Sequence, residues 1–543
     1  GEDCDSDPGD EPGYIHWDDS AYGISVSGNV YSNEGQTAIG NPPCDGTSPV
    51  VRLKVDGQGD YATSCDPATG AYNISNVSFQ GDVVLTVFLD TAGGKRAAVV
   101  TRSPGSNISD LDLYENRLIV RHEEESVLNI SHLAVYDSVD DPDILFTAST
   151  GTPDTLTVDR EAQLYIWPDM TFAPGGNVTL QSGGSGDRWD GSLQIAASST
   201  FSATSTESHS IGGSWFASST ATFNAASSTV TFTSTSTGKT IITSGSSFYN
   251  LVFNGTGGEW SPQDTVTIGN DLFMATGTLA GTQDINVNGG NATGTSGIIN
   301  LTGGTFTLDG TGDFGGDASW TFNNLTFGNG AGTETTQKTG TGNITVNGNL
   351  TITTGHTLQA SSQTWSLAGT GQPFVISGTF EAQSSVFKYV ATSDATATPA
   401  TYYQLEFAPG SGNPTFTLDS GTFTANNHLY IGDGINQVTV TADTQDPTLN
   451  IEGDFEVRSN ATFTASDSQS FSVGGSWSNQ GAFNSNSGAI TFDSSQDPET
   501  IETGSSSFYN VEFNNASGTW TVLSDATSTG NWNLVSVSSF TVT

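Results

Sequence analysis

Short runs of alternating apolar and polar residues mark the N-terminal part of the chain. Ile24–Tyr31 (ISVSGNVY) and Val50–Gly57 (VVRLKVDG) alternate with a period of two, and a turn signal follows each run. Such alternation is typical of half-buried β-strands. Further runs of this type lie at 70–79, 82–90, 95–102 and 115–122. The pattern therefore predicts a β-sandwich over residues 22–148.

Residues 149–543 continue in short β-type segments that are rich in threonine, serine, glycine and asparagine. Examples are TVTFTS (229–234), GNITVNGNLTI (342–352) and NQVTVTA (436–442). Apolar residues do not keep the three- and four-residue spacing of a helix, and the 65 glycines of the chain disfavour helices further. The fold class expected for the whole chain is therefore all-β.

Internal repeats are the strongest architectural signal in this second region. SIGGSW at Ser210–Trp215 recurs as SVGGSW at Ser472–Trp477. SFYNLVFN at Ser247–Asn254 recurs as SFYNVEFN at Ser507–Asn514. The second copy therefore begins about 260 residues after the first, and a pair of tryptophans downstream keeps nearly the same offset.

Two looser copies, TFNNLTF and TYYQLEF, lie between the two close copies. The four motif centres, separated by 74, 80 and 106 residues, are Leu251, Leu325, Leu405 and Val511. Unequal spacing argues against propeller blades of constant size and favours a solenoid with insertions in its turns. An array of separate β-sandwiches is the alternative.

Stacked coils explain why such a sequence folds. One coil cannot bury its own apolar face, but neighbouring coils bury each other. With roughly 20–25 residues per coil, residues 149–543 form about 16–20 coils and a rod about 75–95 Å long. As a continuous strand, SFYNLVFN has two partly apolar faces, made of residues 248, 250 and 252 and of residues 249, 251 and 253. The region resembles parallel β-helix surface proteins, including adhesins and cell-envelope repeat proteins.

A family resemblance also exists in the first region. Asp66–Ile74 (DPATGAYNI) and Ser27–Gly35 (SGNVYSNEG) resemble the turn-and-strand motifs of carboxypeptidase-regulatory-like and collagen-adhesin B-type domains. The resemblance implies a prealbumin-like sandwich that serves as a stalk on secreted proteins. Some domains of this kind carry a Lys–Asn cross-link, for which Lys54 and Lys95 are the only lysines of this region.

Charge separates the two regions and narrows the partners. The 57 acidic and 13 basic residues give a net charge of −44. Nucleic acid and anionic membranes require basic patches, so neither is an expected partner. The chain has no apolar run long enough for a transmembrane helix, so membrane insertion is not expected either. Seven of the 13 basic residues precede residue 122, and only four follow residue 189.

The three cysteines indicate an oxidising compartment. Cys44 and Cys65 enclose a short segment of the predicted sandwich and are expected to form a disulfide, with two unrelated buried thiols as the alternative. Cys4 is left over, either free or paired between chains. Gly1-Glu2-Asp3 fits the start of a cleaved, mature chain. The expected location is extracellular, at the cell surface.

Glycosylation sequons are frequent, and they carry meaning only in a secreted protein. The candidate sites are Asn73, Asn76, Asn107, Asn129, Asn177, Asn254, Asn291, Asn300, Asn324, Asn343, Asn349, Asn460 and Asn515.

Two acidic clusters are candidate calcium sites, and Ca²⁺ is the only cofactor that the sequence suggests. The first comprises Asp3, Asp5, Asp7 and Asp10 within an extended acidic leader, residues 1–21. Its alternating carboxylates are similar to a calcium loop, but Pro8 occupies the glycine position and the distal glutamate is missing. A solvated acidic tail is the alternative.

The second acidic cluster follows the predicted sandwich. Its candidate ligands are Asp140, Asp141 and Asp143, with Asp137 nearby. A polar linker turn is the alternative.

No catalytic constellation is evident, so no enzyme is predicted. The six histidines lack the spacing of zinc ligands, and neither a nucleophile elbow nor a phosphate-binding loop occurs. Six tryptophans recur at repeat positions, where they either stack on sugars or pack in the core. They are Trp215, Trp260, Trp320, Trp365, Trp477 and Trp520.

These features favour a secreted structural protein, the subunit of an extracellular filament, fibre or surface layer. Residues 536–543 (SVSSFTVT) are β-like without a polar cap, so we expect a solenoid edge there that pairs with another copy. Such a head-to-tail contact need not close, and therefore generates a polymer. The alternatives are an adhesin that binds cell-surface glycans and a β-helix enzyme that degrades polysaccharides.

Overall fold

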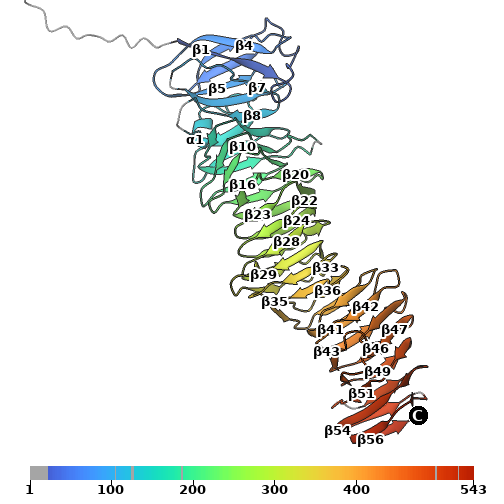
Figure 1. The fold of residues 1–543 in the computed structure, drawn as a ribbon. Helices are drawn as coiled ribbons and strands as arrows, with labels where there is room; N and C mark the ends of the chain where they lie inside the picture. Colours follow the sequence, from blue (N-terminus) through green and yellow to red (C-terminus); the bar gives the residue numbers. More distant parts are fainter. Residues whose placement is uncertain (1–22, 104, 124–126, 185–186, 496–497, 524) are drawn as a thin grey trace, which may run out of the picture. The chain divides into compact units, whose positions relative to one another are not determined.

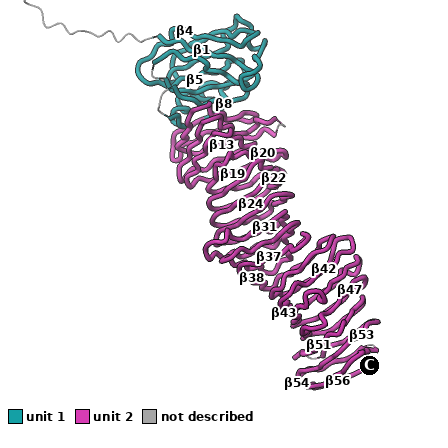
Figure 2. The backbone as a smooth tube through the Cα atoms, viewed as in Figure 1, with its two compact units in different colours: residues 1–147 teal, residues 148–543 magenta. Residues whose placement is uncertain are grey.

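The computed structural model describes residues 23–103, 105–123, 127–184, 187–495, 498–523 and 525–543. The chain folds into two compact units, residues 1–147 and 148–543 (Figure 2). The boundary therefore falls one residue before the expected one. Strands account for 51% of the structure and helix for 1%, which confirms the all-β class. The acidic leader, with Asp3, Asp5, Asp7 and Asp10, lies outside the described residues.

The first unit contains sandwich-like sheets. A three-stranded sheet has the order β4-β1-β7, and a second series of paired strands has the order β3-β2-β5-β6-β8. Every residue of β5 is buried, so this strand lies at the centre of the unit's core. The strands are β1 (Gly23–Tyr31), β2 (Val51–Val55), β3 (Gln58–Thr63), β4 (Ala71–Ser78), β5 (Val83–Leu89), β6 (Ala98–Ser103), β7 (Leu113–Tyr114) and β8 (Arg117–Val120).

One short helix, α1 (Ile130–Leu133), is present among the described residues. Its N-cap is Asn129, whose side-chain oxygen accepts a hydrogen bond from the backbone N–H of His132. The Nδ1 atom of His132 accepts one from the backbone N–H of Asn129 in return. Within the described part of the chain, no helical segment combines the length and the apolar character that crossing a bilayer demands.

The second unit is a long parallel β-solenoid of about 20 turns (Figure 1). A typical coil has three strands, and each strand pairs in parallel with its counterpart in the next coil. The coil made of β13 (Gly176–Leu180), β14 (Leu193–Ile195) and β15 (Thr200–Ser202) is followed by β16 (Ser208–Ile211), β17 (Trp215–Ala217) and β18 (Thr222–Asn224). Paired residues are 18 apart where Val386 meets Gln404 and 31 apart where Val178 meets His209, so insertions change the coil length.

A single strand ladder carries all six repeat tryptophans. Successive pairings lead from β17 to β54 through every intervening coil. Each indole is at most 1% exposed, because the neighbouring coils cover it above and below. The tryptophan-bearing strands are β17, β22 (Asn250–Pro262), β30 (Trp320–Phe322), β36 (Thr364–Leu367), β49 (Trp477–Asn479) and β54 (Asn510–Val522).

A corner in the repeated motif overturns its expected face pattern. The strand β21 (Ser247–Phe248) ends before Tyr249, and β22 begins after it. Phe248, Leu251 and Phe253 are consequently all buried, although a continuous strand would place Phe248 opposite the other two. The two-faced strand predicted from the sequence is therefore wrong at this position.

The looser repeats fall on different strand ladders from the close ones. Leu325 lies on β31 (Asn324–Phe327), in the sheet that contains β21, whereas Leu405 lies on β41 (Thr401–Phe407), in the tryptophan ladder. Their resemblance reflects the aromatic-x-x-Leu pattern that any coil uses around a corner. This explains why the motif centres are unequally spaced.

The close repeats are a true structural duplication. We define the first copy as residues 210–281 and the second copy as residues 472–542. The strand β22 in the first copy and β54 in the second each have 13 residues with nearly the same burial pattern. In each copy the tryptophan near the end of this strand is fully buried.

Candidate functional site

An apolar strand edge lies at β56 (Trp532–Val542). This strand pairs with β54 on one side, and among the described residues no strand pairs with its other side. Of the eleven exposed large apolar residues that the described chain contains, five lie between residues 523 and 542. They are Leu523, Trp532, Leu534, Val535 and Val542. A cavity of about 240 Å³ opens beside them, where the column interior meets solvent.

The equivalent strand of the first copy is covered. The residues Leu272 and Met274 of β24 (Leu272–Gly281) are fully buried, because β26 (Ala292–Gly294) and β27 (Ile298–Leu301) pair with this strand. Leu272 corresponds to Trp532, and Met274 corresponds to Leu534. The exposed residues of β56 are thus core positions of the coil architecture.

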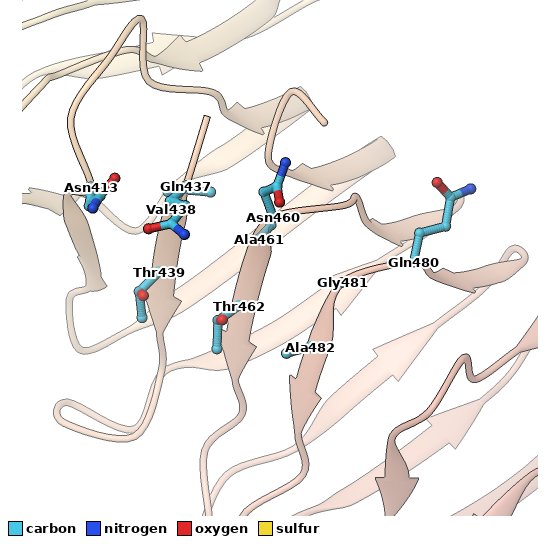
Figure 3. Close-up of a pocket in the computed structure, with 10 residues that line it drawn as sticks. All are labelled: Asn413, Gln437, Val438, Thr439, Asn460, Ala461, Thr462, Gln480, Gly481 and Ala482. Atoms are coloured by element: carbon cyan, nitrogen blue, oxygen red, sulfur yellow. The ribbon is translucent and has the colours of Figure 1, made fainter. Parts of the chain in front are cut away.

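A polar groove of about 440 Å³ lies over one sheet of the solenoid (Figure 3). The sheet contains β40 (Ala395–Ala397), β42 (Thr415–Leu418), β44 (Val438–Thr441), β47 (Ala461–Thr464) and β50 (Ala482–Asn484), in this order. None of the lining residues is charged. They are Asn413, Gln437, Val438, Thr439, Asn460, Ala461, Thr462, Gln480, Gly481 and Ala482.

Two columns of outward-facing side chains cross this sheet, with one residue of each column in every coil. Strand pairing aligns Thr415, Thr439, Thr462 and Ala482 in the first column. It aligns Thr396, Thr417, Thr441, Thr464 and Asn484 in the second. The alternate residues point inward and are buried, so the hydroxyl groups form a regular surface array.

A column of amides borders the threonines. Extension of the same pairing by one or two residues places Asn413, Gln437, Asn460 and Gln480 side by side, as Figure 3 shows. Of these, the Nδ2 group of Asn460 donates hydrogen bonds to the carbonyl oxygens of Gly434 and Ile435. The amide side chains of the other three form no hydrogen bond with any described residue.

The loop before β44 places an apolar side chain near the groove. Ile435 is 80% exposed. The carboxylate of Asp433 accepts hydrogen bonds from the backbone N–H groups of Ile435 and Asn436, and these bonds fix the loop. Burial acts to raise the pKa of Asp433, but these hydrogen bonds outweigh it and the pKa is lowered. The Asn460 amide holds the loop from the next coil.

The predicted calcium cluster in the first unit has another structural role. The carboxylate of Asp143 is buried and accepts hydrogen bonds from the backbone N–H groups of Thr91, Ala92 and Gly93. Asp140 and Asp141 accept hydrogen bonds from the nearby backbone of Asp137 and Asp143. Among the described residues, no group of three or more acidic, histidine or cysteine side chains is arranged to hold a metal ion. Turn stabilisation therefore accounts for these aspartates.

Cys44 and Cys65 form a disulfide, and both residues are buried. Closing a loop of this length stabilises the folded state by about 3 kcal/mol in the chain-entropy description. Cys4 lies outside the described residues.

The sequon asparagines divide into two groups. The Nδ2 groups of Asn291, Asn324, Asn460 and Asn515 donate hydrogen bonds to atoms of a neighbouring coil. A glycan on any of them would replace one of those contacts. Asn254, Asn300, Asn343 and Asn349 are exposed and stay the more accessible candidates.

Burial removes the six repeat tryptophans from any sugar-binding role. Each indole packs against aromatic rings of its own and adjacent coils, as Trp215 does against Phe223 and Phe248 at centroid distances of 4.8 and 5.1 Å. The alternative of core packing is therefore the one observed. Sequence reasoning instead missed the amide column, although its members are separated by 24, 23 and 20 residues, close to the coil length.

No protein-family model, no curated protein and no solved structure matches this chain. The resemblance of the first unit to carboxypeptidase-regulatory-like domains therefore has no support from a family match.

Proposed function

We propose that this chain is a secreted structural protein that assembles head to tail into an extracellular filament, fibre or surface layer, with the β56 edge as one contact. The observation that carries the proposal is the exposed core face of β56. The first unit, with its disulfide, would serve as a stalk-like domain outside the cell.

The first copy indicates what such an edge binds. There, β26 and β27 add in parallel to β24 and bury its apolar residues. A coil from a second copy of this chain would provide the same parallel strand and the same apolar contacts to β56. Apolar burial contributes about 25 cal/mol per Å², and backbone hydrogen bonds fix the register.

Charge should regulate this assembly. A net charge of −44 makes two copies repel each other, and dissolved salt screens that repulsion. Salt also does not weaken the burial of apolar residues. Assembly should therefore increase with ionic strength.

Electron microscopy and sedimentation of the complete chain test the proposal across protein, salt and calcium concentrations. We expect filaments or extended oligomers that increase with salt. Dispersed monomers under all conditions would overturn the proposal, and discrete closed dimers would overturn its head-to-tail geometry.

A matched pair of variants locates the contact. Leu534→Lys places a charge on the exposed core face, whereas Phe273→Lys places one on an exposed residue of the covered strand β24. The first variant should abolish assembly and the second should leave it intact. Normal assembly of Leu534→Lys would show that β56 is not the contact.

A further inference from the structure

The groove over β42, β44, β47 and β50 has features that the structural role does not use. We propose that it binds an uncharged polysaccharide chain that lies along the solenoid axis, across these four strands.

The first argument is the repetition of the polar groups. At the groove, each coil presents one amide, and the coils of β42, β44 and β47 each present two threonine hydroxyls, with successive coils about 4.8 Å apart. A ligand that matches this surface must itself be a polymer with a short polar repeat. Amides and hydroxyls both donate and accept hydrogen bonds, which suits the hydroxyl groups of sugars.

The second argument is that these polar groups are available. The amides of Asn413, Gln437 and Gln480 and the hydroxyls of Thr439 and Thr462 have no hydrogen-bond partner among the described residues of the protein. Their side chains lie along the cavity, with the amides at the strand starts and the threonines beside them (Figure 3). A ligand can therefore bind them without breaking an existing protein contact.

The third argument concerns charge. The lining contains no ionised side chain, whereas the protein as a whole carries −44. An anionic polysaccharide would be repelled by the surrounding field and would find no basic side chain in the groove. A neutral polysaccharide meets neither obstacle.

The fourth argument is the apolar residue in the adjoining loop. Ile435 is 80% exposed and is held in place by hydrogen bonds of Asp433 and Asn460. A sugar ring has an apolar C–H face, and contact with this side chain would remove both from water. Polar repetition together with one fixed apolar contact matches a carbohydrate better than it matches a peptide, which would require a free strand edge or a pocket for side chains.

The four strands fix the length of the ligand. Three inter-strand intervals of about 4.8 Å give a binding site about 14 Å long. Affinity for soluble oligosaccharides should rise with chain length until the site is filled, and then remain constant.

Binding of the complete chain to neutral polysaccharides is the direct test. The probes are suspensions of cellulose, chitin and β-glucan, with alginate and polygalacturonate as anionic counterparts, followed by calorimetry with soluble oligomers of the polymer retained. We expect retention on at least one neutral polymer and none on the anionic ones. No retention on any neutral polymer, or equal retention on anionic ones, would overturn the proposal.

Two double variants separate the groove from the rest of the solenoid surface. Thr439→Val with Thr462→Val removes two hydroxyls from the groove at nearly constant volume. Thr326→Val with Thr351→Val does the same on a paired position of a different sheet. At about 1 kcal/mol per hydrogen bond, the first pair should lower the affinity about tenfold or more, and the second should leave it unchanged.

Thermal unfolding of both double variants verifies that the fold is intact. Outward-facing valine is well tolerated in a strand, so the unfolding temperatures of both variants should match that of the parent protein. Equal loss of binding in the two double variants would contradict a site in the groove. Unchanged binding in the groove variant would also contradict it.

Discussion

The first and second copies of the duplicated block have nearly the same strands but opposite exposure at their last strand. In the first copy, Leu272 and Met274 of β24 are fully buried. In the second copy, their counterparts Trp532 and Leu534 of β56 are 37% and 52% exposed. Both pairs are apolar, so the residues themselves do not cause the difference. The coil that follows β24 causes it, because burial in a solenoid depends on the neighbouring coil.

This comparison also explains the stability expected along the column. Each coil contacts only the coils next to it, so stability is approximately a sum of local terms. A residue between two covered coils should contribute more than its counterpart beside an exposed edge. The following predictions test this difference between the copies and begin with the largest effect.

The largest effect is expected from the buried tryptophans of the two copies. Trp260→Ala should lower the free energy of unfolding by about 3–5 kcal/mol, because it leaves a large cavity between covered coils. Trp520→Ala should have a smaller effect on global unfolding, because the neighbouring coil that contains β56 is partly exposed. Urea unfolding with hydrogen exchange of β24 and β56 measures both. Equal losses would show that the edge does not weaken the second copy.

A buried lysine in the coils between the copies provides the next test. Lys338 on β32 (Thr335–Lys338) is 1% exposed, and burial lowers its pKa to about 8. The unfolded chain binds this proton up to about pH 10.4, so stability should rise with pH between about 8 and 10.4. Lys338→Met should stabilise the protein at neutral pH by about 2 kcal/mol and should remove that rise. Urea midpoints at neutral and alkaline pH are the measurement, and an unchanged pH profile would contradict the burial argument.

The smallest effect concerns a titratable pair that is present in one copy alone. In the first copy, the Nε2 atom of the buried His209 lies 3.4 Å from the Oε2 atom of Glu207, whereas the second copy has Phe471 and Gln469 at these positions. Burial acts to raise the pKa of Glu207, but His209 and the hydrogen bonds from Thr204 lower it overall. Stability from Glu207 is therefore present above its unfolded pKa and is lost as the pH falls through the lower, folded value.

Replacing the pair by its second-copy counterparts tests this acid sensitivity. Glu207→Gln with His209→Phe should reduce the stability lost between about pH 5 and pH 3 by about 1 kcal/mol. Denaturant unfolding of parent and variant at both pH values provides the measurement. The same acid loss in both proteins would show that the pair does not distinguish the copies.

Much of the architecture followed from local patterns. Alternation in segments such as 229–234 and 342–352 predicts strands because inward residues must be apolar, and the structure forms strands there. The spacing of the repeats predicts stacked coils, and the parallel solenoid confirms them. By contrast, the corner at Tyr249 was not predictable, since a turn within an apolar segment has no distinct sequence signal here.

The candidate sites were less accessible to sequence reasoning. The tryptophans could have faced either solvent or core, and only the stacking of coils shows that they are buried. Asp143 belongs to an acidic cluster in the sequence, yet its carboxylate binds the backbone of Thr91, Ala92 and Gly93, about 50 residues away. The groove joins Asn413 to Gln480 across three coil boundaries, a proximity that depends on pairing register.

The sequence by itself determined the strands, the absence of helical periodicity, the approximate coil length and the duplication, because each depends on residues that are near one another in the chain or identical between copies. The tertiary structure alone decided which residues share a ladder, which apolar faces are covered and which polar groups form one surface. The physical reason is that corner insertions vary the coil from 18 to 31 residues, so the register between coils is fixed by packing and hydrogen bonding rather than by spacing.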